Sequence, residues 1–198
     1  MIKSYFYHYF IIMQNQIKET LLHLKKGGLI LYPTDTVWGI GCDATNYDAV
    51  QKIYKLKKRE ESKSMICLMT DLIMLKKYIK EIPSAALNII THAQQPTTII
   101  YDEPKSLAKN LINNDNTIAI RIPNYEFCLQ LLQQFKKPIV STSANMSGQI
   151  APNSFKEISK EILKGVDYVV NLPNEKYSAK PSSIIKVNNN GFITIIRT

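Results

Sequence analysis

The strongest constraint on the fold is the alternation of short apolar segments with longer segments whose apolar residues recur at helical spacing. Segments typical of strands lie at residues 29–32, 64–69, 97–101, 117–122, 138–142, 168–171, 183–187 and 192–197. Segments typical of helices lie at 14–26, 47–57, 71–78, 84–93, 125–135 and 154–163. This alternation predicts an α/β or α+β protein in which helices cover a sheet. Because no repeat or linker interrupts it, we expect a single domain around one mixed sheet.

Composition excludes several other classes of protein. The chain has 198 residues, 45% apolar and 21% charged, which excludes collagen-like, low-complexity and disordered proteins and allows a sizeable core. Twenty-five Lys and Arg against sixteen Asp and Glu give a formal charge of +9, which favours phosphate-bearing partners. Cys42, Cys67 and Cys128 lie far apart without metal-binding spacing, so they support neither a disulfide framework nor a zinc site. We therefore expect a cytoplasmic protein.

The N-terminal sequence MIKSYFYHYFIIM contains a short apolar run. It has one basic residue and no cleavage site, which argues against a signal peptide, and it is shorter than the about 20 residues needed to span a bilayer. We expect no membrane association. We expect residues 1–12 to be an extension, poorly ordered or lineage-specific, before a domain at residues 13–198.

The first candidate site is the segment PTDTVWGIGCDA at residues 33–44. Its glycine spacing superficially resembles the dinucleotide-binding fingerprint, in which the first glycine makes the turn directly off a strand. Here Pro33 and the five residues from Thr34 to Trp38 separate the predicted strand from Gly39. We expect instead a tight loop that turns the hydroxyls of Thr34 and Thr36 toward a ligand. A plain polar turn with Trp38 in the core is the alternative.

The second candidate is a run of cations. Six basic residues fall within twelve positions at the end of a predicted helix: Lys52, Lys55, Lys57, Lys58, Arg59 and Lys63. Such a run is usually a solvated face, but Lys57 and Arg59 at the start of an irregular loop can also clamp a polyphosphate. Arg121 differs because it interrupts an apolar strand. It is either at the end of the sheet in a site or paired in the interior.

The third candidate is STSANMSG at residues 141–148, directly after a predicted buried strand. Its hydroxyl and amide side chains are placed where α/β sheets commonly bind ligands. Turn capping by Ser and Asn is the alternative. No Ser-His-Asp arrangement and no GxxxxGK[ST] motif accompany it, so any ATP is bound by something other than a P-loop.

Taken together, these motifs resemble the YrdC family, the threonylcarbamoyl-adenylate synthases. The resemblance rests on the two segments above, on Lys57-Lys58-Arg59 with Lys63, on Thr117 with AIRIP at 119–123, and on Pro181-Ser182-Ser183-Ile184. It covers roughly residues 14–198. It implies a single α/β domain of α+β-like character, with a twisted mixed sheet flanked by helices and a large concave basic face.

The resemblance also implies an activity and its partners. The enzyme would join L-threonine, bicarbonate and ATP into threonylcarbamoyl-AMP and pyrophosphate, with Mg²⁺ bound through the nucleotide phosphates. Partner transferase proteins would then modify tRNA, which the chain itself could contact. Two alternatives from the residues alone are a non-catalytic module that binds double-stranded RNA or tRNA, and a dinucleotide-dependent oxidoreductase. The first has no use for the polar segment at 141–148.

Site residues follow from the resemblance position by position. The implied threonine-binding residues are Thr34, Arg121 and Ser141; the implied ATP-binding residues are Arg59, Lys63, Thr117, Ser143, Asn145 and Arg197; the implied catalytic residues are Lys57 and Arg59. No metal ligand from a protein side chain is implied. The sequence departs from the family at Glu60, usually proline, and at residues 93–96, usually Trp-Pro-Gly-Pro, which concerns one wall of the expected cleft.

Overall fold

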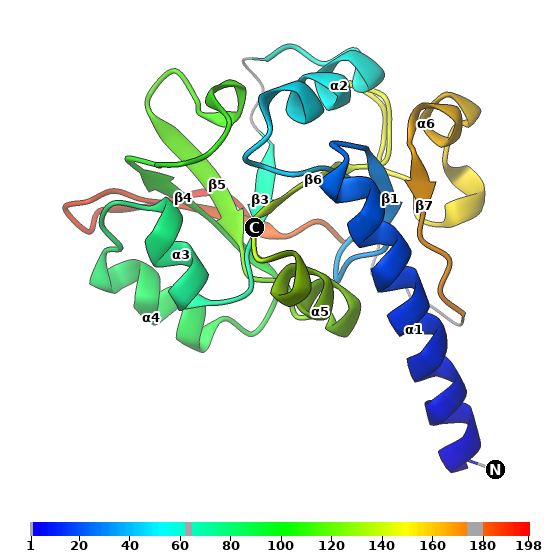
Figure 1. The fold of residues 1–198 in the computed structure, drawn as a ribbon. Coiled ribbons are helices and arrows are strands. Elements are labelled where there is room, and N and C mark those ends of the chain that lie inside the picture. Colours follow the sequence, from blue (N-terminus) through cyan, green and yellow to red (C-terminus); the bar gives the residue numbers. More distant parts are fainter. Residues whose placement is uncertain (1, 62–64, 174–179) are drawn as a thin grey trace.

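The computed structural model describes residues 2–61, 65–173 and 180–198, which fold around one mixed sheet (Figure 1). The strands are β1 (Ile30–Tyr32), β2 (Gly39–Gly41), β3 (Ile66–Leu68), β4 (Thr97–Asp102), β5 (Thr117–Arg121), β6 (Ile139–Ser143), β7 (Tyr168–Val169), β8 (Ser183–Val187) and β9 (Ile193–Arg197). The helices are α1 (Ile2–Lys25), α2 (Tyr47–Lys57), α3 (Leu72–Tyr78), α4 (Ser84–His92), α5 (Glu126–Phe135) and α6 (Lys160–Gly165). Short 3-10 turns, η1 (Lys109–Leu111) and η2 (Phe155–Glu157), complete the elements.

The sheet combines parallel and antiparallel pairs. Its strand order is β7-β1-β2-β6-β3-β5-β4-β8-β9. The pairs β1–β7, β3–β5 and β4–β8 are parallel, and the other neighbours are antiparallel. The predicted mixed sheet with flanking helices is therefore confirmed. This order brings the ends of β5, β6 and β8, which are far apart in sequence, to one region of the sheet.

Two apolar clusters lie on opposite faces of the sheet. Side chains of α1 and α5 pack on Ile30 and Tyr32 of β1. The intervening Leu31 points to the other face, where it joins the cluster formed with α2, α3, α4 and α6. In the view of Figure 1, α3 and α4 lie below β4. The helices thus bury both faces near β1, which explains why this strand is apolar throughout.

The ends of α2 are set by local capping. The side chain of Asn46 accepts a hydrogen bond from the Ala49 N–H at the first turn. At the other end Lys58 adopts a left-handed conformation with φ 49°, and its N–H donates hydrogen bonds to the Lys55 and Tyr54 carbonyls. The chain turns sharply at this residue, so the side chains before and after it point in different directions.

Two elements differ from the sequence-based expectation, in addition to the N-terminal helix described below. The helix expected at 154–163 is divided into η2 and α6, because Ser159 caps a new helix by accepting from the Ile162 N–H. A strand that was not expected, β2, pairs with β1 and β6. It needs Gly41, since a Cβ there would lie 2.6 Å from the Val140 carbonyl oxygen.

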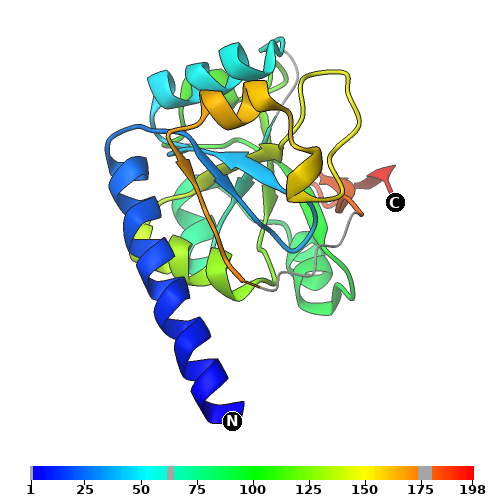
Figure 2. The same ribbon diagram turned by 90° about the vertical axis from the view of Figure 1, so that its right-hand side faces the viewer.

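The N-terminal helix is longer than expected. It begins at Ile2 and not at Gln14, so most of the proposed extension at residues 1–12 continues the same helix. Figures 1 and 2 show its first turns projecting beyond the rest of the molecule. From residue 7 onward, where the side chains are described, Met13 is the first buried one; Tyr9 and Ile12 are partly buried against the same cluster, and Tyr7 and Phe10 are exposed. No helix in the described residues has the length and apolar character required to cross a bilayer.

Candidate functional site

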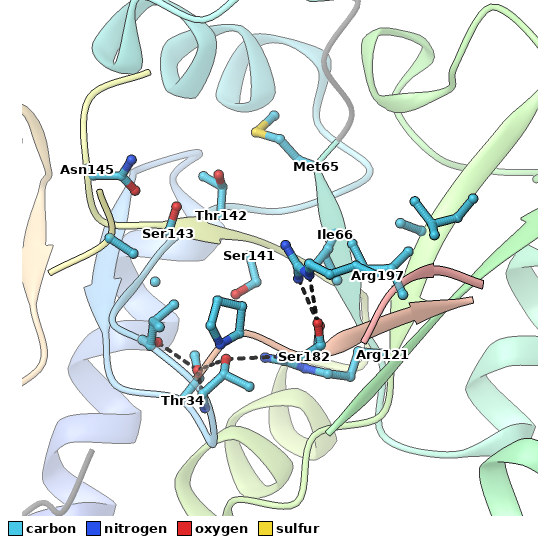
Figure 3. Close-up of a pocket in the computed structure, with 18 of the residues that line it drawn as sticks. Thr34, Met65, Ile66, Arg121, Ser141, Thr142, Ser143, Asn145, Ser182 and Arg197 are labelled. Carbon is cyan, nitrogen blue, oxygen red and sulfur yellow. Dashed lines mark hydrogen bonds between the residues drawn. The ribbon is translucent and has the colours of Figure 1, made fainter. Parts of the chain in front are cut away.

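A cavity of about 480 Å³ lies where the β1–β2 loop, the ends of β5 and β6, the loop after α2 and the β8–β9 hairpin meet (Figure 3). Seven of the residues expected in the site line it: Thr34, Arg59, Arg121, Ser141, Ser143, Asn145 and Arg197. They come from five separate segments of the chain. The structure therefore brings most of the candidate residues into one cavity.

Two expected residues are absent from the residues that line the cavity, and a third lies outside the described part of the chain. Thr117 is not among the lining residues, and its buried hydroxyl donates to Asp115 (2.6 Å) and accepts from Asn113 (2.9 Å) before β5. Lys57 is also not among the lining residues, because its side chain points to the main chain behind the cavity. Lys63 lies outside the described residues.

One wall of the cavity is a buried, hydrogen-bonded network. The hydroxyl of Thr34 donates to the Val37 carbonyl (2.7 Å) and accepts from the Thr36 N–H (3.1 Å). The guanidinium of Arg121 donates from Nη1 to the Thr36 hydroxyl (3.0 Å), and Nη2 lies 3.1 Å from Oδ1 of Asp35. Both partners of this ion pair are under 10% exposed. The interactions fix the guanidinium in place, so Arg121 is both in the site and paired.

Arg121 retains an unused donor. Its Nε is buried without a hydrogen-bond partner in the described residues. Asp35 is further held by the Asn124 N–H, which donates to Oδ2 (3.1 Å). A buried donor without a partner is costly, so a ligand that accepts from it gains affinity. This makes Arg121 a suitable anchor for an anion.

The opposite wall follows β6. Asn145 donates from Nδ2 to the carbonyls of Met146 (3.0 Å) and Gln149 (2.7 Å), while its Oδ1 is buried and has no hydrogen-bond partner among the described residues. Behind this segment Nζ of Lys57 donates to the main-chain carbonyls of Ser143 and Asn145. The wall therefore presents hydroxyl and amide groups from a loop whose main chain is held from behind.

The two cations at the end of α2 have shifted pKa values. Burial, reinforced by the nearby charge of Arg59, lowers the pKa of Lys57 to about 7. Burial also lowers the pKa of Arg59, although a guanidinium remains charged at neutral pH. Arg59 lines the cavity and Lys57 does not. The positive charge that the end of α2 brings to the cavity therefore comes from Arg59 and not from Lys57.

The β8–β9 hairpin supplies the third side. Arg197 donates from Nε (3.0 Å) and Nη2 (2.7 Å) to the Ser182 carbonyl, which holds its guanidinium at the rim (Figure 3). The Ser182 hydroxyl is 2.7 Å from that of Thr98. With Arg59 and Arg121, three guanidinium groups line the cavity among the described residues, and none of these lining residues carries a carboxylate. Such a cavity suits an anionic ligand.

The first candidate segment fits both of its interpretations. Thr34 and Thr36 line the cavity, and Trp38 is 3% exposed within the core. Gly39 and Gly41 lie in a strand and not at a strand-to-helix turn, so they do not form the dinucleotide-binding arrangement. The departures at Ala93–Pro96 lie elsewhere: these residues line a second cavity of about 590 Å³ beside Asp35.

Sequence reasoning missed the part played by Asp35. Its carboxylate orients Arg121, but 86 residues separate the two in the sequence, so spacing gives no signal. The direction of Lys57 did have a signal. It follows Ile53 by four and Tyr54 by three positions, which places it on the buried face of α2. The described residues contain no cluster of three or more His, Cys, Asp or Glu side chains placed to hold a metal ion.

Comparisons with known proteins identify relatives over most of the chain. The family model Sua5_yciO_yrdC, described as telomere recombination, matches residues 23–198. A putative threonylcarbamoyl-AMP synthase of Methanocaldococcus jannaschii is 36% identical over 92% of this chain and 87% of its own length. The threonylcarbamoyl-AMP synthase of Pseudoalteromonas translucida is 34% identical over 81% of this chain and 87% of its own length.

Solved structures share the fold. YciO of E. coli has a TM-score of 0.81 at 23% identity, covering 93% of this chain and 89% of its own. Sua5 of P. abyssi, complexed with L-threonine, has a TM-score of 0.77 at 24% identity over 86% of this chain. This chain covers 50% of that Sua5 chain and so spans about half its length. At these sequence identities, the similarity to both structures shows a shared fold alone.

Proposed function

The chain belongs to the Sua5_yciO_yrdC family, and from this premise we propose that it is a threonylcarbamoyl-AMP synthase, an enzyme that uses L-threonine, bicarbonate and ATP. The observation that carries the proposal is the cavity itself. One wall holds buried hydroxyls around a fixed guanidinium, and the facing wall holds a polar loop and two further arginines, Arg59 and Arg197. A small amino acid and a nucleotide that bind next to each other need two walls as different as these.

The threonine wall, defined as Thr34, Arg121 and Ser141, binds the amino acid in this proposal. A guanidinium held flat by a carboxylate can bond a substrate carboxylate with its remaining donor. The hydroxyls of Thr34 and Ser141 lie beside it and can orient the rest of a small polar substrate. The name of the P. abyssi Sua5 complex, which contains L-threonine, supports this choice of substrate.

The nucleotide wall, defined as Arg59, Ser143, Asn145 and Arg197, binds ATP in this proposal. Arginine side chains bind phosphates in a bidentate manner, and the hydroxyl and amide groups add directional hydrogen bonds. The wall lacks carboxylates, so a Mg²⁺ ion would arrive on the phosphates and not on protein ligands. Bound there, the ion would neutralise charge on the phosphate oxygens. Lys63 and Thr117 remain proposed nucleotide contacts from the family resemblance alone.

The chemistry needs positioning and charge stabilisation. The neutral amine of threonine attacks bicarbonate, and water leaves to give the carbamate. A carbamate oxygen then attacks the α-phosphorus of ATP, the bond to the bridging oxygen breaks, and pyrophosphate leaves. The cavity holds the reactants in contact, and Arg59 stabilises the charge that develops on the phosphoryl oxygens. No protein side chain has to act as a nucleophile.

We also propose that the product passes to transferase proteins that modify tRNA in the cytoplasm. The mixed anhydride between a carbamate and a phosphate is reactive toward water, so a short transfer path favours a nearby acceptor protein. Direct contact with tRNA, or with other double-stranded RNA, is proposed from the net charge of +9. Residues 1–12 are proposed to lie outside the catalytic domain at 13–198.

The test is an incorporation assay with the purified chain. ATP, Mg²⁺, L-threonine and ¹⁴C-bicarbonate are incubated together, and the products are separated rapidly by chromatography. We expect a labelled adenylate and pyrophosphate in equal amounts, and neither when threonine is omitted or replaced by alanine. Threonine-independent pyrophosphate release, or no labelled adenylate at any concentration, would overturn the proposed function.

A further inference from the structure

Lys57 is a buried cation without a carboxylate partner in the described residues. Its side chain is 1% exposed, and its Nζ donates to the main-chain carbonyls of Ser143 and of Asn145 (2.5 Å). In addition, the Ser147 N–H donates to the Lys57 carbonyl (3.0 Å). One residue is therefore bonded to the loop 143–149 at three points.

Burying an ammonium is costly unless dipoles replace the water around it. Here two carbonyl oxygens do so, and charge-assisted bonds of this kind are stronger than neutral ones. A methionine would fill a similar volume without that cost. The ammonium is therefore explained by the main-chain groups that it holds, not by packing. It is absent from the residues that line the cavity, so phosphate binding does not explain it either.

The loop that Lys57 holds carries half of the nucleotide wall. Ser143 and Asn145 line the cavity directly, and their carbonyls are the acceptors for Lys57. Arg59 follows two residues later, after the left-handed Lys58 turns the chain. The end of α2 thus points one cation toward the loop and the next toward the cavity. Arg59 and the loop with Ser143 and Asn145 are therefore attached to the same turn, whereas Arg197 reaches the nucleotide wall from β9.

We propose that Lys57 is a positioning residue, whose ammonium ties the loop 143–149 to the end of α2 and so sets the separation of Arg59 from Ser143 and Asn145. It acts through the main chain of that loop and makes no contact with phosphate. The catalytic consequence rests on the proposed function. The expected effect on the loop does not rest on the proposed function, because the hydrogen bonds from Lys57 to the loop are present without any ligand.

The first experiment measures amide hydrogen exchange of residues 143–149 in the ligand-free protein. The test variant is Lys57→Met. The matched control is Lys58→Met, which removes the same charge one position away, from a side chain that is 75% exposed. We expect exchange of the Ser147 and Gln149 amides to become about tenfold faster or more in Lys57→Met, the scale of losing a bond to a charged group. Lys58→Met should match the wild type.

Kinetics then separate positioning from direct binding. A loosened loop should raise the KM for ATP by about tenfold or more, leave the KM for threonine within about twofold, and weaken inorganic pyrophosphate binding less than Arg59→Met does. Unchanged loop exchange together with a loss of pyrophosphate affinity equal to that of Arg59→Met would overturn the proposal. Altered exchange in a protein whose wild type makes no adenylate would contradict the proposed function and leave the positioning role intact.

A measurement on the wild type covers the case in which Lys57→Met does not fold. Side-chain ¹⁵N signals of lysine Nζ and arginine Nε are followed by NMR while inorganic pyrophosphate is added. We expect the Arg59 Nε signal to move and the Lys57 Nζ signal to move no more than that of Lys58. A Lys57 shift larger than that of Arg59 would show direct phosphate contact and overturn the proposal.

Discussion

The two walls of the cavity are built in different ways. Thr34, Arg121 and Ser141 on the threonine wall are at most 8% exposed, and their wall is bonded internally through Thr36 and Asp35. On the nucleotide wall, Arg59, Ser143 and Asn145 are partly exposed and Arg197 is exposed. A preformed wall loses little entropy on binding a small ligand, which favours selectivity. In the proposed function, the more open wall lets ATP enter and pyrophosphate leave.

The largest expected effect tests the internal bonding of the threonine wall. Replacing Arg121 with Met leaves the carboxylate of Asp35 buried without its ion-pair partner, so the free energy of unfolding should fall by about 3–5 kcal/mol. Chemical denaturation measures it. The control is Lys80→Met, which breaks the exposed pair with Glu103 (2.9 Å) and should cause a much smaller loss, because exposed ion pairs contribute little to stability. Equal losses in the two variants would remove the proposed difference between the walls.

The next effect concerns rate instead of stability. Replacing Arg59 with Ala removes charge stabilisation from the nucleotide wall, so threonine-dependent pyrophosphate release should fall by about 10² to 10³-fold. Because Arg59 lies at a loop and is only partly buried, the free energy of unfolding should change by less than about 1 kcal/mol. A folded variant with the wild-type rate would exclude Arg59 from the site.

A single hydroxyl on the nucleotide wall should have a smaller effect. Ser143→Ala removes one hydrogen bond to a charged ligand, which is worth about 1.5–3 kcal/mol of ATP binding free energy. Calorimetric titration with a non-hydrolysable ATP analogue measures it, and a parallel titration with threonine should show an unchanged affinity. If threonine affinity fell by the same factor, the two walls would not be independent.

The smallest effect, taken per pH unit, is a pH dependence from Lys57. Its pKa is lowered to about 7 in the folded chain and lies near 10.4 in an unfolded one, so between these values the unfolded state binds more protons. Stability should therefore rise with pH across this window, by at most about 1.4 kcal/mol per pH unit from this group. Lys57→Met should lack this component, and the difference between the two denaturation series isolates it. Parallel curves from pH 7 to 10 would contradict the assignment.

Local patterns predicted much of the fold. The bounds of α2 and β8 match the sequence-based ranges, since the helical spacing of apolar residues in α2 and the short apolar run in β8 are local signals. The pattern failed where a local preference was overridden by packing. Gly39–Gly41 forms a strand because it pairs with β1 on one side and β6 on the other, and Gly41 allows the close approach of the Val140 carbonyl. At 154–163 the apolar spacing continued across Ser159, whose capping bond begins a separate helix.

For the site, residue types were easier to predict than their directions. Thr34, Ser143 and Arg121 were expected near a ligand and line the cavity. The ion pair of Arg121 with Asp35 depends on strand order, which the sequence pattern did not specify. For Lys57, its charge suggested phosphate, whereas its place on the buried face of α2 decides where the ammonium points. The position of Lys57 on the buried face of α2 was therefore a better guide to its contacts than its charge.

The most direct test of the central claim is a crystal structure with L-threonine and a non-hydrolysable ATP analogue bound together. The account predicts threonine on Thr34, Arg121 and Ser141, phosphates on Arg59 and Ser143, and the threonine amine directed toward the α-phosphate across the same cavity. A nucleotide in the second cavity beside Ala93–Pro96, or threonine and nucleotide on separate surfaces, would contradict it.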